Sequence, residues 1–319
     1  MYKVLTLNNI AVDGLRRLPR ERYEIASEIA HPDAILLRSH NMHDMEIPDT
    51  VVAVGRAGAG VNNIPCDGLA HKGVPVFNAP GANANAVKEL AIGGMLLGAR
   101  NLCDAREYVK TLTGTGAELK KAVESGKKQF VGFELPGKTL GVIGLGAIGV
   151  AVANAALDLG RKVVGYDPAI TVRNAWQLSS GVEQEETLDE LCQHADFVTC
   201  HGPLMDATRN LVNASRIALM NDNAVLVNFA RGGVVDDDAA IAALDSGKLH
   251  AYVTDFPTPE LIAHPKVVAL PHLGASTGEA GEYCAIMVAV NVKDYLENGS
   301  IRESVNYPEA RLSRLDAWR

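Results

Sequence analysis

The sequence has few cysteines and pairs none of them closely, which argues against a disulfide-stabilised secreted protein. The five cysteines are odd in number and widely spaced, and none stand in a C-x-x-C arrangement. This usage is typical of reduced thiols in a cytosolic protein. The first residues, Met-Tyr-Lys-Val-Leu-Thr-Leu, become polar too soon for a signal peptide. We therefore expect a cytoplasmic location.

The sequence also lacks a membrane-length apolar run and an excess of positive charge. The most apolar run, residues 141–153, is shorter than the roughly 20 residues that a membrane-spanning helix requires. Thirty Lys and Arg stand against 38 Asp and Glu, so the net charge is −8. An acidic chain has no general attraction for nucleic acid or an anionic membrane. Any anionic ligand must therefore be held by individual arginines and lysines.

What is present is the pattern of a folded α/β protein. The 319 residues suffice for two domains, and 47% of them are hydrophobic. Short β-branched runs alternate with helical patterns, which predicts parallel sheets with crossover helices. A first series of expected strands covers residues 3–7, 34–38, 51–54 and 74–77. A second series covers residues 139–143, 162–166, 197–200, 224–228, 251–254 and 267–270.

Two helical patterns connect these series. One runs from about Ala86 to Leu112, with Asn83 or Asn85 as its expected N-cap. Another, from about residue 279 to residue 297, is expected to return the chain to the first unit. The first unit would then be discontinuous in sequence.

The most specific local signal is a G-x-G-x-x-G motif at Gly144, Gly146 and Gly149. An apolar strand precedes it, a helix of small residues follows it, and the next strand ends just before Asp167. The glycines permit a tight turn and let the backbone approach a pyrophosphate at the helix N-terminus. Asp167 is placed to accept hydrogen bonds from a ribose and would repel a 2′-phosphate. The pattern predicts NAD in preference to NADP; the alternative is a turn that only packs a helix on a sheet.

Polar residues follow most strands of the second series: Asp167, His201, Arg231, Asp255 and His272. In an open parallel sheet, ligands bind beyond the carboxyl ends of the strands. Solubility alone does not explain such a row of residues at one edge. We therefore expect this edge to be the active site.

Three residues of the second series are suited to hydride-transfer chemistry on a hydroxy acid. Arg231 offers a fork of donors for a carboxylate. His272 can take a hydroxyl proton, because its reference pKa is about 6.5. Glu260 could hold the imidazole in one tautomer and stabilise its protonated form. Singly, each is more often a structural or solvated residue; together with the glycine motif they predict a dehydrogenase.

These motifs resemble the D-isomer specific 2-hydroxyacid dehydrogenase family. The resemblance rests on Gly144–Gly149, Asn228–Gly233, the Asp255 to Glu260 spacing, and Pro271-His272, and it covers nearly the whole chain. It implies that Arg231, Glu260 and His272 are the catalytic set and that no metal is needed. It also implies an NAD site formed by Gly144, Gly146, Ala147, Ile148, Gly149, Asp167, His201, Gly202, Pro203, Phe229, Ala230, Arg231, Asp255, His272, Gly274 and Ala275.

The family resemblance also implies the domain architecture. We expect two doubly wound parallel-sheet domains. One is a flavodoxin-like substrate-binding domain of residues 1–98 and 286–319, and the other is a Rossmann NAD-binding domain of residues 99–285. Members of the family lead us to expect a homodimer, or a tetramer of dimeric units.

The first unit narrows the expected substrate. The stretches Val54–Asn63 and Val76–Pro80 resemble those of family members that oxidise 3-phospho-D-glycerate, the entry to serine synthesis. That resemblance implies that Arg56 contacts a phosphate and that backbone N–H groups of Ala57, Gly58, Ala59 and Gly60 contact a carboxylate. It also places Asn78, Arg231 and His272 at the substrate. A glycine-rich loop with an adjacent arginine is independently suited to anions.

Two segments depart from the family pattern. Many relatives carry a Trp and an Arg before the second unit, where this chain has Lys127 and Lys128, so we expect one of these lysines on the phosphate. Proline placement also differs between Asp255 and Glu260, which affects the position of the Glu. The last residues, 305–319, resemble a linker that in longer relatives leads into a small serine-binding regulatory domain. If nothing follows residue 319 in the natural protein, we expect no feedback inhibition by serine through such a domain.

Two alternatives remain open at this point. Another family member, such as a glyoxylate/hydroxypyruvate reductase or a D-lactate dehydrogenase, would need no phosphate contact, so Arg56 is the discriminating residue. An NAD-sensing scaffold or corepressor would retain the same motifs. Metal chemistry is not expected, because His40 and His43 are close in sequence but read as a solvated loop.

Overall fold

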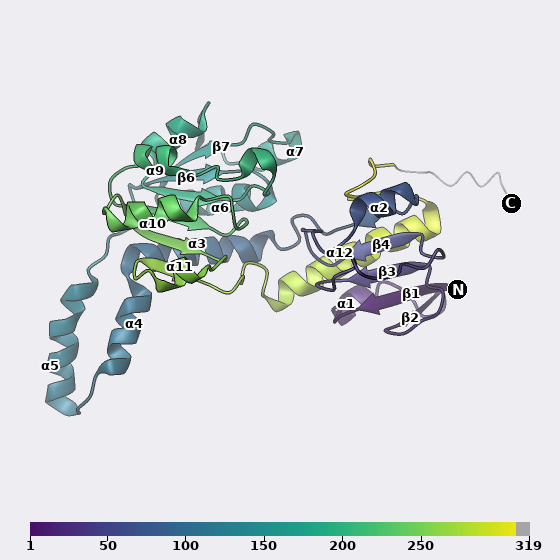
Figure 1. Cartoon of the computed structure of the whole chain (residues 1–319), viewed down its shortest axis with the longest axis horizontal. Helices are drawn as coiled ribbons and strands as arrows, with labels where there is room; N and C mark the ends of the chain where they lie inside the picture. Colours follow the sequence, from purple (N-terminus) through teal and green to yellow (C-terminus); the bar gives the residue numbers. More distant parts are fainter. Residues whose placement is uncertain (311–319) are drawn as a thin grey trace. The chain divides into compact units, whose positions relative to one another are not determined.

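A computed structural model of the chain describes residues 1–310, and its contacts divide the chain into two compact units (Figure 1). Unit 1 consists of residues 1–86 and the chain from Ala275 onward, and unit 2 is Val87–Gly274. The boundaries expected after residues 98 and 285 fall inside two long helices, whereas the observed divisions fall close to where these helices begin. Residues 311–319 of the linker-like segment lie outside the described residues.

Unit 1 contains a five-stranded sheet in which every neighbouring pair of strands is parallel. The order β2-β1-β3-β4-β5 is the flavodoxin-like order that we predicted. The elements are β1 (Tyr2–Leu7), α1 (Val12–Leu15), β2 (Tyr23–Ala26), β3 (Ala34–Leu37), β4 (Ala53–Arg56), α2 (Cys66–His71), β5 (Val76–Phe77) and α12 (Gly278–Asn298).

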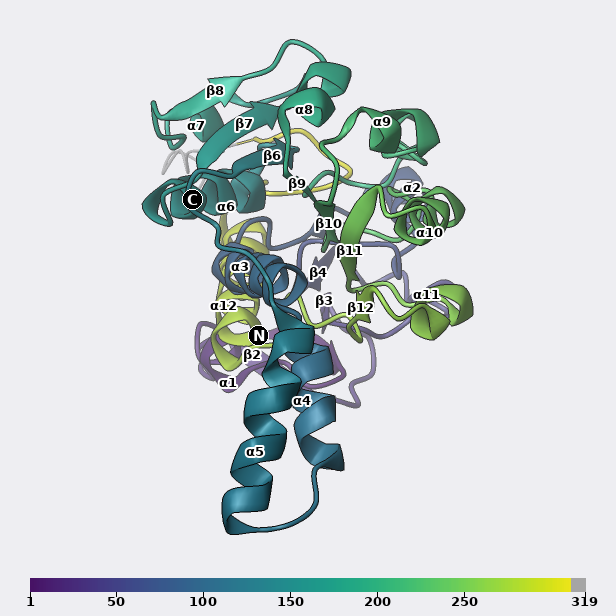
Figure 2. The same ribbon diagram turned by 90° about the vertical axis from the view of Figure 1, so that its left-hand side faces the viewer.

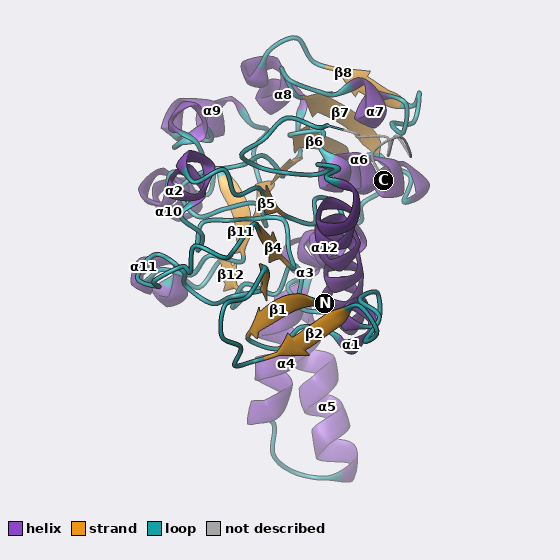
Figure 3. Cartoon of the chain, turned by 90° about the vertical axis from the view of Figure 1, so that its right-hand side faces the viewer, coloured by secondary structure: helices purple, strands orange, loops and turns teal. Residues whose placement is uncertain are grey.

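Helix α12 covers one face of the sheet in unit 1, and Figure 3 shows it beside the strands. Val288 and Val292 come so close to the sheet that a Cβ on Gly55 would meet their methyl groups at 2.7 and 2.8 Å. The helix begins at the Thr277 cap, whose hydroxyl accepts from the Ala280 N–H, and ends at Gly299 with a positive φ of 70°. The prediction of a final helix that returns to the first unit is confirmed. Helix α2 packs on the opposite face through Leu69.

Unit 2 contains a seven-stranded parallel sheet of order β12-β11-β10-β9-β6-β7-β8. Renumbered from β6, this is the Rossmann order with one further strand, as predicted. The strands are β6 (Thr139–Ile143), β7 (Lys162–Tyr166), β8 (Val182–Gln184), β9 (Phe197–Cys200), β10 (Ala224–Asn228), β11 (Leu249–Thr254) and β12 (Val267–Ala269). The helices are α3 (Ala84–Arg100), α4 (Leu102–Thr111), α5 (Gly116–Gly126), η1 (Lys127–Phe130), α6 (Ala147–Asp158), α7 (Val172–Ala175), α8 (Leu188–His194), η2 (Asp206–Thr208), α9 (Ala214–Leu219), α10 (Asp237–Asp245) and α11 (Pro259–Ala263).

Helices cover both faces of the sheet in unit 2 (Figure 2). Helices α3 and α6 pack on one face, and α8 to α11 pack on the other. Two glycines let α3 approach closely, since a Cβ on Gly94 would meet the Phe229 ring at 2.7 Å and one on Gly98 would meet Val225 at 2.8 Å. Among the described residues, no helix combines the length and the apolar composition needed to cross a membrane.

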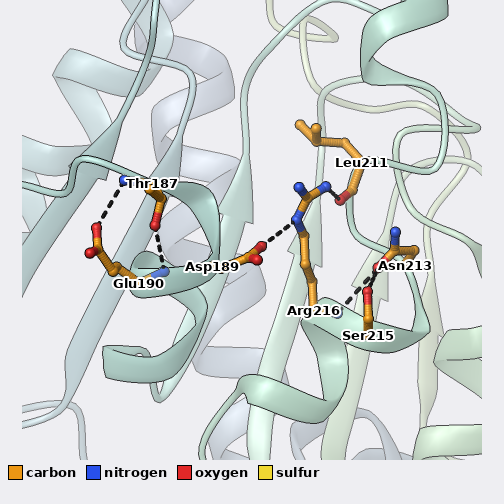
Figure 4. A network of polar contacts seen from close by, with 7 residues as sticks. All are labelled: Thr187, Asp189, Glu190, Leu211, Asn213, Ser215 and Arg216. Carbon is orange, nitrogen blue, oxygen red and sulfur yellow. Dashed lines mark hydrogen bonds and ion pairs between the residues drawn. The ribbon is translucent and has the colours of Figure 1, made fainter.

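Figure 4 shows how two of these helices are fixed at their ends. Thr187 and Glu190 form a reciprocal capping box at the start of α8. Arg216 of α9 donates from Nε to Asp189 of α8 at 2.9 Å and from an Nη to the Leu211 carbonyl at 2.6 Å. A cap of this kind contributes about 1 kcal/mol, and an exposed ion pair contributes less. The Arg216–Asp189 contact joins the first turns of α8 and α9.

The prediction of one continuous helix from Ala86 to Leu112 is wrong. The chain forms α3 and α4 instead, because Asn101 between them has a left-handed backbone with φ +50°. Helix α3 begins at Ala84, so Asn83 stands at the expected N-cap position and Asn85 lies inside the helix. The buried Oδ1 of Asn83 has no hydrogen-bond partner, so the side chain does not cap the helix in this structure.

Several elements were not predicted. Strands β2 and β8 lie at sheet edges, and α5 follows a short turn after α4. Helices α4 and α5 lie side by side and extend away from the sheet of unit 2 (Figure 2). The Tyr108 hydroxyl joins them by donating to the Ala122 carbonyl at 3.0 Å.

Candidate active site

The carboxyl edge of the sheet in unit 2 carries the predicted row of polar residues. Asp167, His201 and Asp255 directly follow β7, β9 and β11, while Arg231 and His272 stand three residues after β10 and β12. Because all these strands are parallel, the residues lie at one edge. This is the edge at which Rossmann sheets bind ligands.

The glycine loop between β6 and α6 has the geometry of a dinucleotide site. Gly144 has φ +89°, and a Cβ there would meet the Gly202 nitrogen at 2.8 Å. A Cβ on Gly149 would collide with the Gly144 carbonyl. Gly146 is the N-cap of α6, and nothing lies within 4 Å of where its Cβ would be. An open space at the N-terminus of a 12-residue helix, with Ala147 and Ile148 in its first turn, suits a pyrophosphate.

Asp167 is tied to the loop by its own hydrogen bonds. Its Oδ2 accepts from the Leu145 N–H at 2.8 Å, and its Oδ1 accepts from the Ala169 N–H at 2.8 Å. Each carboxylate oxygen keeps a further lone pair for a ribose hydroxyl. Asp167 therefore stabilises the glycine loop as well as offering the expected ribose contact.

His201 and Gly202 form the wall of the glycine loop on the β9 side. The His201 N–H donates to the Ile143 carbonyl at 2.8 Å, and its Nε2 lies 3.0 Å from the Thr199 hydroxyl. Its Nδ1 is shielded from solvent and has no partner. Burial lowers the pKa of His201 to about 4, so its ring is neutral at pH 7.

The lowered pKa of His201 predicts a loss of stability at acidic pH. The unfolded chain takes up a proton near the reference pKa of about 6.5, whereas the folded chain does so only near 4. Stability contributed by the neutral ring is therefore complete above about pH 6.5 and falls towards pH 4, by roughly 2–3 kcal/mol. Urea unfolding across this range should show a shallower pH dependence for His201→Gln. The exposed His71→Gln should behave as wild type, and equal slopes for all three proteins would refute the assignment.

Asp255 leaves one buried oxygen without a partner. Its Oδ2 accepts from the Gly274 N–H at 2.7 Å, and the side chain is 1% exposed. The Oδ1 has no hydrogen-bond partner, which is costly for a buried carboxylate. An amide N–H₂ group such as that of nicotinamide would satisfy it. Together with the open helix N-terminus, this orphaned oxygen fits NAD.

The Asn228–Gly233 loop holds Arg231 at the sheet edge. Asn228 is buried; its Oδ1 accepts from the Ala230 N–H, and its Nδ2 donates to the Arg231 carbonyl at 2.9 Å. One Nη of Arg231 donates to the Ala230 carbonyl at 2.7 Å. The rest of this half-buried guanidinium can face a carboxylate. Phe229 instead packs beneath α3, so it can contribute only its backbone.

His272 and Glu260 are not joined in this structure. His272 has φ +55°, and its ring lies against that of Phe256. Glu260 is exposed in the first turn of α11, and no hydrogen bond or ion pair links it to His272 within residues 1–310. Burial raises the pKa of Asp237, and the negative charges of Asp236, Asp238 and Glu260 add to the rise.

In unit 1, Arg56 ends β4 and directly precedes the predicted glycine loop. Its Nε donates to the Arg38 carbonyl at 3.1 Å, and its guanidinium lies over Gly58. The N–H groups of Ala57 and Gly58 already bond to the Leu37 and Arg56 carbonyls. Within the described residues, the N–H groups of Ala59 and Gly60 have no partner. Only two of the four backbone N–H groups expected to bind the substrate carboxylate are therefore free to do so.

Sequence reasoning missed Arg38, which directly follows β3 as Arg56 ends β4. An Arg38 Nη lies 3.5 Å from where a Cβ on Gly281 would be, and both guanidinium groups lower the pKa of Cys284, which burial raises more strongly. The sequence offered one sign of its role, since Arg38 is the last residue of the predicted strand 34–38 in the first series.

The other expected substrate residues are engaged with the protein itself. The Asn78 side chain is 9% exposed and donates to the Ala59 carbonyl at 2.6 Å, so it supports the loop. Lys127 forms an ion pair with Glu124, and Lys128 is exposed on the same 3₁₀ turn. Pro203 follows the His201 loop, and Ala275 begins the second segment of unit 1.

Comparison with known proteins gives the family. Residues 92–274 match the model of the D-isomer specific 2-hydroxyacid dehydrogenase NAD-binding domain. The chain is 39% identical to D-3-phosphoglycerate dehydrogenase of Methanocaldococcus jannaschii, over 100% of this chain and 62% of the relative. It is 38% identical to hydroxypyruvate reductase of Thermotoga maritima, over 82% of this chain and 83% of the relative. The structure of D-mandelate dehydrogenase from Rhodotorula graminis superposes with a TM-score of 0.80, covering 98% of this chain and 99% of that one at 25% identity.

The chain belongs to the D-isomer specific 2-hydroxyacid dehydrogenase family, and unit 2 is its NAD-binding domain. The predictions of family, fold class and cofactor are confirmed. The chain spans 62% of the M. jannaschii phosphoglycerate dehydrogenase and 56% of that from Rattus norvegicus.

Proposed function

We propose that this protein catalyses the NAD-dependent oxidation of 3-phospho-D-glycerate to 3-phosphohydroxypyruvate, the first step of L-serine biosynthesis. The observation that carries the proposal is the neighbouring pair Arg38 and Arg56, which stands beside two unpartnered amides in unit 1. A doubly charged phosphate requires such a concentration of positive charge on an acidic chain. Relatives named D-3-phosphoglycerate dehydrogenase support the same substrate.

The residues of unit 2 supply the groups that the reaction requires. Arg231 binds the substrate carboxylate through paired N–H donors. A ring nitrogen of His272 takes the proton of the C2 hydroxyl, while the C2 hydrogen leaves as a hydride. NAD, when bound, supplies the acceptor for that hydride. Asp255 and Asp167 bind the two ends of the cofactor, and Glu260 would stabilise protonated His272.

The phosphate and the rest of the carboxylate are assigned to unit 1. Arg56 and Arg38 bind the phosphate, and the Ala59 and Gly60 amides are the free donors of the loop expected to bind the carboxylate. Asn78 contributes by holding that loop. Lys127 or Lys128 would place a further positive charge beside the phosphate.

The test is NADH formation from 3-phosphoglycerate and NAD at alkaline pH, with the reverse reaction from phosphohydroxypyruvate. Unphosphorylated glycerate and hydroxypyruvate serve as controls. A strong preference for the phosphorylated pair would support the proposal. Equal or better turnover of the unphosphorylated pair would retain a dehydrogenase but discard this substrate.

Replacing Arg56 should weaken binding of the phosphorylated substrate selectively. Removing one charge-assisted contact costs about 1.5–3 kcal/mol, so KM for 3-phosphoglycerate should rise roughly 10–100-fold in Arg56→Ala. KM for unphosphorylated glycerate should change little, as should both values in a control Arg20→Ala, where an exposed arginine is removed. Initial-rate kinetics with both substrates measure these KM values. An unchanged KM for 3-phosphoglycerate would count against the phosphate assignment.

A hydroxypyruvate or glyoxylate reductase is the second candidate. It is supported by the T. maritima relative, of whose length the alignment covers 83%. Such an enzyme would reduce the unphosphorylated acid with no dependence on Arg56. Absence of turnover in either direction, with NAD still bound, would instead favour an NAD-sensing scaffold or corepressor.

We also propose a homodimer, or a tetramer built from dimers, in which helices α4 and α5 contact a second copy. Helix α4 buries none of its residues, and Leu102, Val109, Val123 and Val131 all expose large apolar side chains. Such a helical pair is stabilised by covering these side chains. Light scattering measures the assembly directly, and a monomer at micromolar concentration would contradict the proposal.

A cytoplasmic location is proposed on the state of the cysteines. All five are free thiols, and three of them are buried. This is the usage expected in a reducing compartment.

A further inference from the structure

Phe256 is in ring contact with His272. The ring centroids are 5.1 Å apart, and the ring planes meet at 59°. Phe256 follows Asp255 at the carboxyl end of β11, and its N–H donates to the Thr254 hydroxyl at 3.2 Å. The backbone that carries the Phe256 ring is therefore fixed by the sheet.

His272 itself has few other restraints. Its N–H donates to the Asp255 carbonyl at 3.2 Å, and its left-handed backbone sets the direction of Cβ. Within residues 1–310, neither ring nitrogen has a hydrogen-bond partner, and Glu260 forms no ion pair with the ring. The ring of Phe256 therefore limits the rotation of the imidazole where no polar partner does so.

Phe256 also packs against the loop that carries Arg231. A Cβ on Gly232 would lie 3.4 Å from the Phe256 Cβ and 3.7 Å from its Cγ. Gly232 directly follows Arg231, so one aromatic side chain contacts both the proton-acceptor segment and the carboxylate-binding loop. These distances are those of ordinary van der Waals contact.

We infer that Phe256 is a positioning residue, which holds the His272 imidazole at a set orientation relative to the Arg231 loop. The inference rests on the proposed function of His272 as proton acceptor. A general base must come within hydrogen-bond reach of its proton, and a misplacement of about 1 Å costs up to about 100-fold in rate. A phenyl ring is flat, rigid and set by two torsions, whereas leucine fills similar space without a ring that an imidazole can contact in this tilted geometry.

The first test compares Phe256→Leu with Phe256→Tyr, which keeps the ring. In Phe256→Leu, kcat should fall roughly 10–100-fold, while the Kd for NAD and the unfolding midpoint change little. Phe256→Tyr should restore most of kcat. Phe133→Leu is the matched control, because it removes a ring that also lies against a histidine, His250, at 5.3 Å, and neither residue has a proposed role in the reaction. If Phe256→Leu does not fold, Phe256→Met provides the same comparison.

The second test asks whether Phe256 acts through His272. In a His272→Gln background, Phe256→Leu should cause little further loss of rate, because the group that it positions is already absent. Equal losses in both backgrounds would overturn the inference, as would wild-type kcat in Phe256→Leu. Substantial activity of His272→Gln itself would instead contradict the proposed function.

A third measurement needs no substrate. With ¹³C-labelled histidine, the His272 imidazole signal is identified by its absence in His272→Gln. It should be single and sharp in wild type and in Phe256→Tyr, and doubled or broadened in Phe256→Leu. An unaltered signal in Phe256→Leu would overturn the inference even for a protein whose substrate differs from the one proposed.

Discussion

His272→Gln should lower kcat by about 10²–10⁴-fold, because it removes the group proposed to take the substrate hydroxyl proton. The Kd for NAD should be retained, since the glycine loop, Asp167 and Asp255 are unaltered. The pH profile of kcat/KM for oxidation should differ between wild type and the variant, because the variant has no general base at this position. Steady-state kinetics between pH 5 and 10, with NAD binding measured by fluorescence, provide the comparison.

The control for His272→Gln is His71→Gln, which alters an exposed histidine in unit 1. It should match wild type in kcat and in pH profile. If His272→Gln retains kcat within tenfold, His272 does not perform the proton transfer, and the active-site assignment fails with it.

Arg231→Gln should lower kcat/KM for the 2-hydroxy acid by roughly 10²–10³-fold. Loss of one partner of a hydrogen-bonded charge pair costs about 2–5 kcal/mol, and each 1.4 kcal/mol is a factor of ten. Much of the effect should appear in KM, because the carboxylate is bound before as well as during the reaction. The backbone of the loop should persist, because Asn228 holds it through the Arg231 carbonyl and the Ala230 N–H.

Arg231→Lys separates charge from geometry. Lysine keeps the charge but lacks the planar fork, so it should recover only part of the loss. Full activity in Arg231→Lys would show that a point charge is sufficient. Wild-type KM in Arg231→Gln would assign carboxylate binding to other groups, such as the Ala59 and Gly60 amides.

The sequence predicted the central part of unit 2 closely because local and long-range signals agree there. Strands β6, β7, β9 and β10 begin and end as expected. Each is a buried, β-branched run closed by a glycine or polar residue, so burial and turn chemistry indicate the same limits. The shared parallel direction then places Asp167, His201 and Asp255 at one edge without further information.

The features that sequence reasoning missed depend on weak local signals. Edge strands β2 and β8 have one neighbour each and carry Glu24 and Glu183. The break between α3 and α4 depends on the left-handed backbone of Asn101. The residues on both sides of Asn101 favour a helix, so no local signal in the sequence marks the break. The direction of a side chain cannot be read from sequence spacing, so the contact expected between Glu260 and His272 stays a prediction. Proximity of Arg38 to Arg56 follows from the pairing of β3 with β4.

The double hydrogen bonding of Asp167 bears on how the cofactor preference of this protein could be altered. A change to NADP requires removal of the acidic group that repels the 2′-phosphate. Here the same removal deprives the Leu145 N–H of its acceptor, so the loop that receives the pyrophosphate loses its support. A single substitution to a side chain without an acceptor would therefore weaken use of both dinucleotides, and redesign must supply a neutral acceptor for Leu145 together with a new cation for the phosphate. In this chain, one carboxylate both sets the preference between the two cofactors and holds the loop that receives the pyrophosphate.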